Sequence, residues 1–106
     1  MNIKEYQEFT PTTALYPKEM EDYYLSTGLA AEAGEVAGVY AKYFRGDYNR
    51  EVLIQKIKKE LGDNMWFISQ ICKSLELNIE DVLDGNVDKL TSRKTRGVLK
   101  GSGDDR

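Results

Sequence analysis

Residues 50–75, REVLIQKIKKELGDNMWFISQICKSL, carry the pattern that decides the fold. Their apolar side chains recur at alternating intervals of three and four residues, which is the repeat of an amphipathic helix. These side chains are Ile54, Ile57, Leu61, Met65, Ile68, Cys72 and Leu75. Nowhere in the chain do apolar and polar residues alternate as they do in a half-buried strand. We therefore expect an all-α protein.

Two helices are expected before this segment. A short helix covers roughly residues 2–9, and a connector follows it that contains the only prolines of the chain, Pro11 and Pro17. Proline is well tolerated in the first turn of a helix, so Pro17 favours the start of a second helix from about 18 to 45. Gly46 is a typical residue to end that helix.

A fourth helix and an irregular tail are expected after the central segment. Asn78 is a suitable N-cap, and Glu80 would lie in the first turn, where the helix dipole favours an acid. The helix should end near Arg93, and residues 97–106 form the irregular tail. A chain of 106 residues has room for one domain. We expect residues 1–106 to form a helical bundle of about four helices per subunit.

The composition excludes several classes of protein. Apolar residues make up 41% of the chain and charged residues 31%, which is typical of a globular protein and not of a disordered one. There is no histidine and only one cysteine, Cys72. An internal disulfide, the usual zinc sites and histidine-dependent nucleophilic catalysis are therefore ruled out. A bound metal would need oxygen ligands, which favours magnesium, manganese or calcium.

Two further features concern the location of the protein. No apolar run approaches the roughly 20 residues that a membrane-spanning helix needs, and residues 1–9 lack the apolar core of a signal peptide. A single cysteine suits a reducing compartment. A cytoplasmic protein without membrane contact is therefore expected.

Four carboxylates point in directions that a helix normally reserves for its core. With about 100° between successive residues, Glu32 falls in the middle of the apolar stripe of the second helix, and Glu35 lies within about 60° of that stripe. In the segment 50–75, Glu60 falls inside the apolar arc and Asp63 lies at its edge. Each of the two helices therefore carries a pair of acids at i and i+3.

Buried acids that repel one another destabilise a fold, each by roughly several kcal/mol. A divalent cation removes this penalty, because it supplies positive charge and takes oxygen ligands. A single pair is more often a chance surface feature, but two pairs on adjacent helices favour a metal site inside a helix bundle. Small residues around the first pair would allow a helix or a ligand to approach closely: Gly28, Ala30, Ala31, Ala33, Gly34, Ala37 and Gly38.

Taken together, these residues resemble a known family. Residues 28–37, GLAAEAGEVA, followed by KELGDNMW at 59–66, resemble the E-x-x-E and E-x-x-D signature of the MazG-like, all-α nucleoside triphosphate pyrophosphohydrolases. The sequence NVDKLTSR at 86–93 is similar to the N-x-x-K-x-x-x-R element of that family. The endings RKTRG, at 93–97, and GSGDDR, at 101–106, resemble its short single-domain members. The resemblance covers nearly the whole chain.

The resemblance implies a Mg²⁺-dependent hydrolase, with Mn²⁺ as a possible substitute metal. Its substrates would be ribo- or deoxyribonucleoside triphosphates, and its products a monophosphate and pyrophosphate. The catalytic and metal-binding residues implied are Glu32, Glu35, Glu60 and Asp63. One departure from the family pattern is Asn64, where an aliphatic residue is expected. Asn64 should face the core and form a hydrogen bond near the site or across an interface.

The resemblance also implies which residues contact the substrate. Three residues of the fourth helix, Asn86, Lys89 and Arg93, would bind the triphosphate. Taken alone, Lys89 and Arg93 could equally complement the dipole of their own helix. Aromatic side chains could stack on the base, and Tyr6 and Trp66 are the candidates here. Aromatic residues at helical spacing more often belong to a core. Phe9 and Tyr16 are also aromatic and could equally stack on the base.

Other functions compete with this one. A dUTP- or dCTP-specific hydrolase, or the phosphoribosyl-ATP enzyme of histidine synthesis, would share the architecture. The C-terminal R-x-x-R-G and G-x-G-D-x-R elements argue against the histidine enzyme. A non-enzymatic helical module could bind nucleic acid through residues 86–106, which carry six basic residues against three acidic ones. We do not expect nucleic acid as a partner, because the acidic remainder of the chain would repel a phosphate backbone. A purely structural helical module would bind no metal.

The amount of apolar surface favours an oligomer. Four helices in about 90 residues cannot cover all their apolar faces within one subunit, and water would then meet a large apolar patch. Helix packing across a two-fold axis would cover both copies of the patch. We expect a homodimer or homotetramer. The resemblance to the family also implies that the basic fourth helix of one subunit approaches the acids of another.

Overall fold

The computed structural model describes residues 1–106, and all its regular structure is helical. The four α-helices begin and end within a few residues of the expected positions, which confirms the all-α prediction. Their bounds are Ile3–Phe9 for α1, Glu21–Phe44 for α2, Arg50–Ser74 for α3 and Ile79–Thr95 for α4. Two short 3-10 helices connect α1 to α2: η1, Thr10–Thr13, and η2, Lys18–Met20.

Asparagine side chains fix the start of three helices. Asn2 accepts a hydrogen bond from the backbone of Glu5, whose side chain accepts one from the backbone of Asn2, so α1 begins with a capping box. Asn49 and Asn78 cap α3 and α4 in the simpler way, through one side-chain oxygen each. These caps satisfy backbone N–H groups that otherwise lack a partner in the first turn. Helix α2 has no side-chain cap and follows directly from η2.

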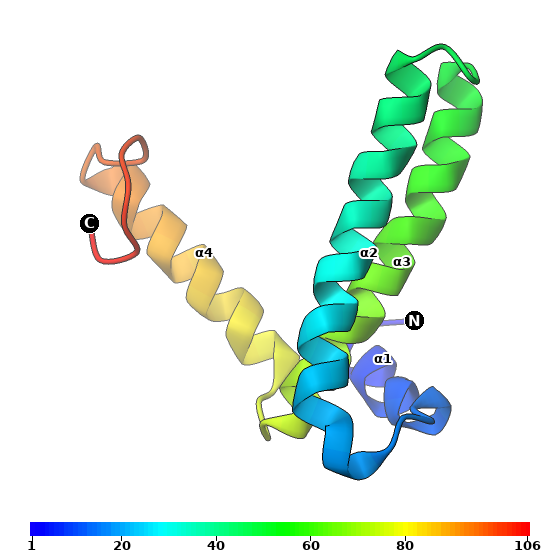
Figure 1. Ribbon diagram of the computed structural model, residues 1–106. Helices are drawn as coiled ribbons and strands as arrows, with labels where there is room; N and C mark the ends of the chain where they lie inside the picture. Colours follow the sequence, from blue (N-terminus) through cyan, green and yellow to red (C-terminus); the bar gives the residue numbers. More distant parts are fainter.

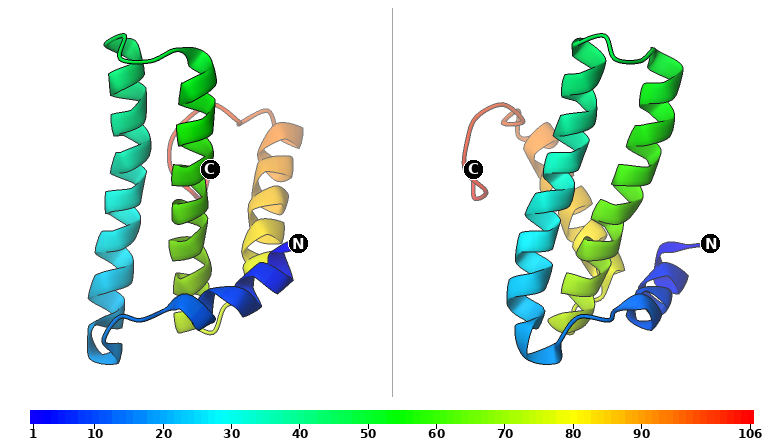
Figure 2. Two further views of the ribbon diagram at one scale, coloured as in Figure 1. Left: turned by 90° about the vertical axis from the view of Figure 1, so that its right-hand side faces the viewer. Right: turned by 45° about the vertical axis from the view of Figure 1, so that its right-hand side comes forward.

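Helices α2 and α3 form an antiparallel hairpin that dominates the molecule (Figure 1). Gly46, with a φ of 91°, lies in the loop that joins them, and glycine tolerates this conformation without strain. Helix α1 lies across the end of the hairpin opposite that loop, and α4 leaves from the same end (Figure 2). The far end of α4 stands apart from the hairpin, as Figure 1 shows. Within one chain, α2 and α3 therefore form a hairpin, and α1 and α4 adjoin one end of it. The four helices do not close into the expected four-helix bundle.

The core is small and lies mainly where α1 meets the hairpin. Only nine of the 106 residues are buried, among them Leu25 of α2, Phe67 and Cys72 of α3 and Ile79 of α4. The expected apolar stripe of α3 is only partly buried, because the helix has one long partner: Ile54, Leu61 and Leu75 are more than half exposed. The radius of gyration is 16.7 Å, whereas a compact chain of this length has about 13 Å. A single subunit is thus extended, with much apolar surface exposed.

None of the helices has the combination of length and apolar character that crossing a membrane requires.

Candidate metal and nucleotide site

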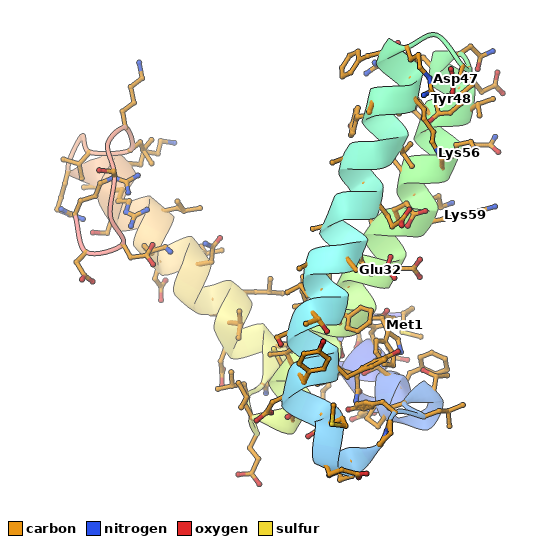
Figure 3. All side chains as sticks on the ribbon, in the orientation of Figure 1. Met1, Glu32, Asp47, Tyr48, Lys56 and Lys59 are labelled. Atoms are coloured by element: carbon orange, nitrogen blue, oxygen red, sulfur yellow. The ribbon has the colours of Figure 1, made fainter.

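Three acids from α2 and α3 converge on one point. Glu32, Glu60 and Asp63 each offer a carboxylate oxygen, and these oxygens lie within 4.8 Å of one another. Glu32 and Glu60 are half-buried and Asp63 is exposed. Figure 3 shows Glu32 part-way along the hairpin, between the end that carries α1 and the loop marked by Asp47 and Tyr48. The i and i+3 spacing on α3 and the antiparallel packing of α2 together produce this cluster.

The pKa of Glu32 is raised by this environment. Burial is the largest cause, followed by the negative charges of Asp63, Glu60 and Glu35. Glu35 itself is exposed and lies outside the group of three, one turn further along α2. The structure therefore brings three of the four expected acids together and leaves the fourth beside them.

No basic side chain neutralises these acids. The ion pairs of the molecule are all elsewhere, at Glu21, Asp47 and Asp104. A cluster of carboxylate oxygens without cationic partners suits a hard divalent cation, which prefers oxygen ligands. The residues present therefore fit Mg²⁺ or Mn²⁺.

Asn64 connects the two helices at the cluster. Its Nδ2 donates hydrogen bonds to the backbone carbonyls of Glu32 (3.0 Å) and Glu60 (2.8 Å). The residue that departs from the family pattern thus links the backbones of two of the clustered acids, which agrees with the expected hydrogen bond near the site. This link fixes the register of α2 against α3 where the acids meet.

An aromatic pocket of about 490 Å³ adjoins the acids. Glu32 and Asp63 lie in its wall, and the rest of the wall comes from the connector and from both long helices. The remaining wall residues are Thr13, Leu15, Tyr16, Tyr24, Trp66 and Phe67. Five of the eight wall residues are apolar or aromatic and two are acidic, which suits a ligand with a flat apolar group joined to a metal-bound anion.

Hydrogen bonds hold two of the aromatic walls in place. The indole Nε1 of Trp66 donates to Thr13 Oγ1 (2.8 Å). The hydroxyl of Tyr16 donates to Glu21 Oε2 (2.7 Å) and accepts from Gln70 Nε2 (3.1 Å). Burial, and then the hydrogen bond to Glu21, raise the pKa of Tyr16. Both rings are therefore fixed through their polar atoms, and each also packs on a neighbouring ring: Tyr16 on Tyr24, with centroids 4.9 Å apart, and Trp66 edge-to-face with Phe67, at 5.0 Å.

Gly28 makes room for another wall of the pocket. A Cβ atom at this position would lie 2.2 Å from Cε1 of Phe67, far inside van der Waals contact. Gly34 and Gly38 have no neighbouring atom within 4 Å of the corresponding position. Of the three glycines in α2, only Gly28 is thus explained by packing within the chain.

Tyr6, the other expected base contact, does not line this pocket. Its hydroxyl lies 3.5 Å from the carbonyl oxygen of Gly62, as a long hydrogen bond, and its ring lines a separate hollow with Ile3 and Met65. Burial, and then the charge of Asp63, raise its pKa. Of the two aromatic residues expected to contact the base, Trp66 lies at the pocket and Tyr6 lies outside it.

Of the connector residues in the pocket wall, the sequence offered Tyr16 as a possible base contact but gave no indication of Thr13 or Leu15. Thr13 and Tyr16 form hydrogen bonds with Trp66 and Gln70, which follow them by more than 50 residues in the sequence. The one available signal was that Trp66 follows Asp63 by three residues and so shares its side of the helix.

The expected phosphate-binding residues lie on α4, away from the acids. Asn86 is exposed, Lys89 is half-buried and Arg93 is buried. Lys89 and Arg93 face residues 97–106, which fold back on the end of α4. Because α4 diverges from the hairpin (Figures 1 and 2), one chain does not bring these residues to the acid cluster.

The fold and the site define a class: small all-helical proteins in which acids of two adjacent helices form an oxygen-only site beside an aromatic pocket. The chain belongs to the family of the MazG nucleotide pyrophosphohydrolase domain, whose model matches residues 22–98. Membership indicates a nucleotide pyrophosphohydrolase. The match covers α2, α3 and α4, and leaves out the connector and most of residues 97–106.

A relative in a bacteriophage matches over its full length. The Gene 37 protein of Mycobacterium phage L5 is 37% identical over 116 aligned positions, which cover the whole of both chains. The name of that protein states no activity. No solved structure matches the chain.

Proposed function

We propose that this protein hydrolyses ribo- or deoxyribonucleoside triphosphates to the monophosphate and pyrophosphate, with Mg²⁺ as cofactor and Mn²⁺ as a substitute. The observation that carries the proposal is the adjacency of two features: three unneutralised carboxylates within 4.8 Å and an aromatic pocket that shares Glu32 and Asp63 with them. A nucleoside triphosphate has the matching parts, a flat base joined through a sugar to a metal-binding phosphate chain.

The acids would hold the metal and orient the reacting water. Glu32, Glu60 and Asp63 are the nearest ligands, with Glu35 as the fourth acid on the same site. Bound Mg²⁺ would supply positive charge for the phosphate oxygens and lower the pKa of a coordinated water. One of the four carboxylates would accept the proton of the attacking water. Attack at the α-phosphorus would release pyrophosphate.

The nucleoside would occupy the aromatic pocket. Trp66 offers a ring face for stacking. Tyr16, which lies outside the residues matched by the family model, offers a second one. Stacking on aromatic faces is tolerant of the base, at about 1–3 kcal/mol per base. The pocket therefore favours nucleotides over inorganic polyphosphates.

A second subunit would complete the site. Asn86, Lys89 and Arg93 are the basic and polar residues expected at the triphosphate, yet α4 of the same chain diverges from the acids (Figure 1). A two-fold dimer, or a pair of such dimers, would let α4 of one copy approach the hairpin of the other and would cover its exposed apolar side chains. We therefore propose a homodimer or homotetramer as the active form.

Product analysis tests the proposal. With Mg²⁺ and a panel of the eight common ribo- and deoxyribonucleoside triphosphates, the protein should release pyrophosphate and monophosphate in one step. In ¹⁸O-labelled water the label should enter the monophosphate, because the attack is at the α-phosphorus. Label in the pyrophosphate, or release of orthophosphate from every nucleotide, would refute it. Turnover of dUTP or dCTP alone would restrict the substrate range.

A further inference from the structure

Residues 97–106 form an ordered loop that arginine side chains hold against α4. Arg93 Nη2 donates to the carbonyls of Gly103 (3.2 Å) and Asp104 (2.7 Å). Arg106 donates to the carbonyls of Val98 (3.2 Å), Leu99 (2.9 Å) and Gly103 (2.6 Å). Guanidinium groups bind several carbonyls at once because their donors are fixed in a plane. The loop therefore has a definite position over the end of α4.

The loop places one carboxylate oxygen between two cations. Asp104 Oδ1 lies 3.4 Å from Lys89 Nζ and 3.8 Å from Arg93 Nη2. The Asp104 side chain is 88% exposed, whereas that of Arg93 is only 6% exposed and lies beneath the loop. A single anionic oxygen thus meets both basic residues that are expected to bind the phosphate chain. A phosphate oxygen would make the same two contacts.

Arg93 is incompletely satisfied in this arrangement. Its Nε is buried and has no hydrogen-bond partner, and a buried donor without a partner costs free energy. Arginine binds phosphate best through two parallel N–H groups, but here Nη2 already donates to the loop. A phosphate group could take the contacts that Asp104 and the loop now occupy.

We propose that Asp104 is an internal competitor for the anion site of Lys89 and Arg93, so that it lowers the affinity of the site for a phosphate chain. The inference rests on the proposed function, which assigns these two residues to the triphosphate. Binding of a phosphate chain displaces the Asp104 carboxylate and opens the loop above Arg93. Asp104 and most of its loop lie outside the residues matched by the family model.

Binding of inorganic tripolyphosphate tests the proposal, because this probe has no base and needs no hydrolysis. Its dissociation constant would be measured by calorimetry on the full chain at moderate salt, where charges that form no contact are screened. Asp104→Asn keeps the shape of the side chain and removes its charge. Exposed ion pairs are each worth about 0.2–1 kcal/mol, so losing two such contacts should tighten binding by about twofold to thirtyfold.

Asp105→Asn is the matched control. It removes the same charge from the next residue, which forms no ion pair, and should leave binding within about twofold of the unmodified protein at moderate salt. In a Lys89→Gln background the gain from Asp104→Asn should shrink, because one of the released cations is absent. With a hydrolysed nucleotide, the gain should appear as a lower KM at unchanged kcat.

Two results would overturn the proposal. One is an Asp104→Asn protein that binds tripolyphosphate no more tightly than Asp105→Asn; the other is a gain that is unchanged in the Lys89→Gln background. Failure of the proposed function would look different, since no nucleotide would then be cleaved while the binding difference between the two aspartate variants would persist.

Discussion

Phe67 and Gly28 illustrate how single residues shape the site. The ring of Phe67 lines the aromatic pocket and packs against the bare backbone of Gly28 on the neighbouring helix. Glycine inside a helix costs up to about 1 kcal/mol relative to alanine, so its presence needs a compensating contact. At Gly28 that contact is the ring, whereas Gly34 has no neighbour that would exclude a methyl group.

Gly28→Ala should destabilise the protein. The new Cβ would lie 2.2 Å from Phe67 Cε1, so the ring has to move, and overpacking of this kind costs about 1–3 kcal/mol. The melting temperature should fall, and KM for a nucleotide should rise because the pocket wall shifts. Gly34→Ala is the control and should raise the melting temperature through helix propensity alone. Equal changes in the two variants would contradict the packing described.

Local and distant interactions differ in how far the sequence predicts them. The cap at Asn78 and the i, i+3 acids were readable, because each depends on a few neighbouring residues. The partnership of Trp66 with Thr13 was not, since it joins positions 53 residues apart. Which aromatic rings share the pocket depends on such distant contacts, and the sequence alone did not separate Trp66, in the pocket wall, from Tyr6, outside it.

At the scale of elements, the pairing of α2 with α3 creates the site. Two amphipathic patterns predicted that both helices carry acids toward a common side, but the period of a helix does not fix which turns meet. Asn64 fixes that register by bridging the carbonyls of Glu32 and Glu60. The direction of α4 was not predictable either, because its only buried apolar residue is Ile79, in the first turn.

Two nearly isosteric changes at Asn64 should differ in effect. Asn64→Leu removes the two donated hydrogen bonds. It should lower the free energy of unfolding by about 1 kcal/mol, because both acceptor carbonyls belong to helical backbone. Asn64→Asp should be the more destabilised of the two in the absence of metal, since it adds a charge beside three acids and two carbonyl oxygens. Denaturant titration measures both free energies of unfolding. A more stable aspartate variant would show that Asn64 does not join the helices at the acids.

At the scale of the whole molecule, one chain is incomplete as a globule. Nine buried residues form a small core for a chain of 106 residues, and such a chain gains most from burying further surface. The exposed large apolar side chains follow two helix faces. On the hairpin they include Tyr40, Phe44, Ile54 and Leu61, and on α4 they include Val82, Leu83, Val87 and Leu90.

The active form should therefore be an oligomer. Light scattering at micromolar concentration should give a mass of two or four chains of 12.1 kDa. Leu83→Asp should lower that mass and the rate of pyrophosphate release together, because it places a charge on the exposed apolar face of α4. A fully active species of one chain would contradict the proposal that α4 of a second copy completes the site.

The most direct measurement compares Glu60→Gln with Glu51→Gln. Both changes lie on α3, but only Glu60 belongs to the cluster of three acids. Mg²⁺ should raise the melting temperature of the unmodified protein and of Glu51→Gln by several degrees, because a ligand that binds only the folded state stabilises it. Glu60→Gln should lose that response, and its rate of pyrophosphate release should fall at least about 100-fold. Removing a group that only supports a metal ligand already lowers activity by up to about 100-fold. A Glu60→Gln protein that still responds to Mg²⁺ and still releases pyrophosphate at the unmodified rate would contradict the account.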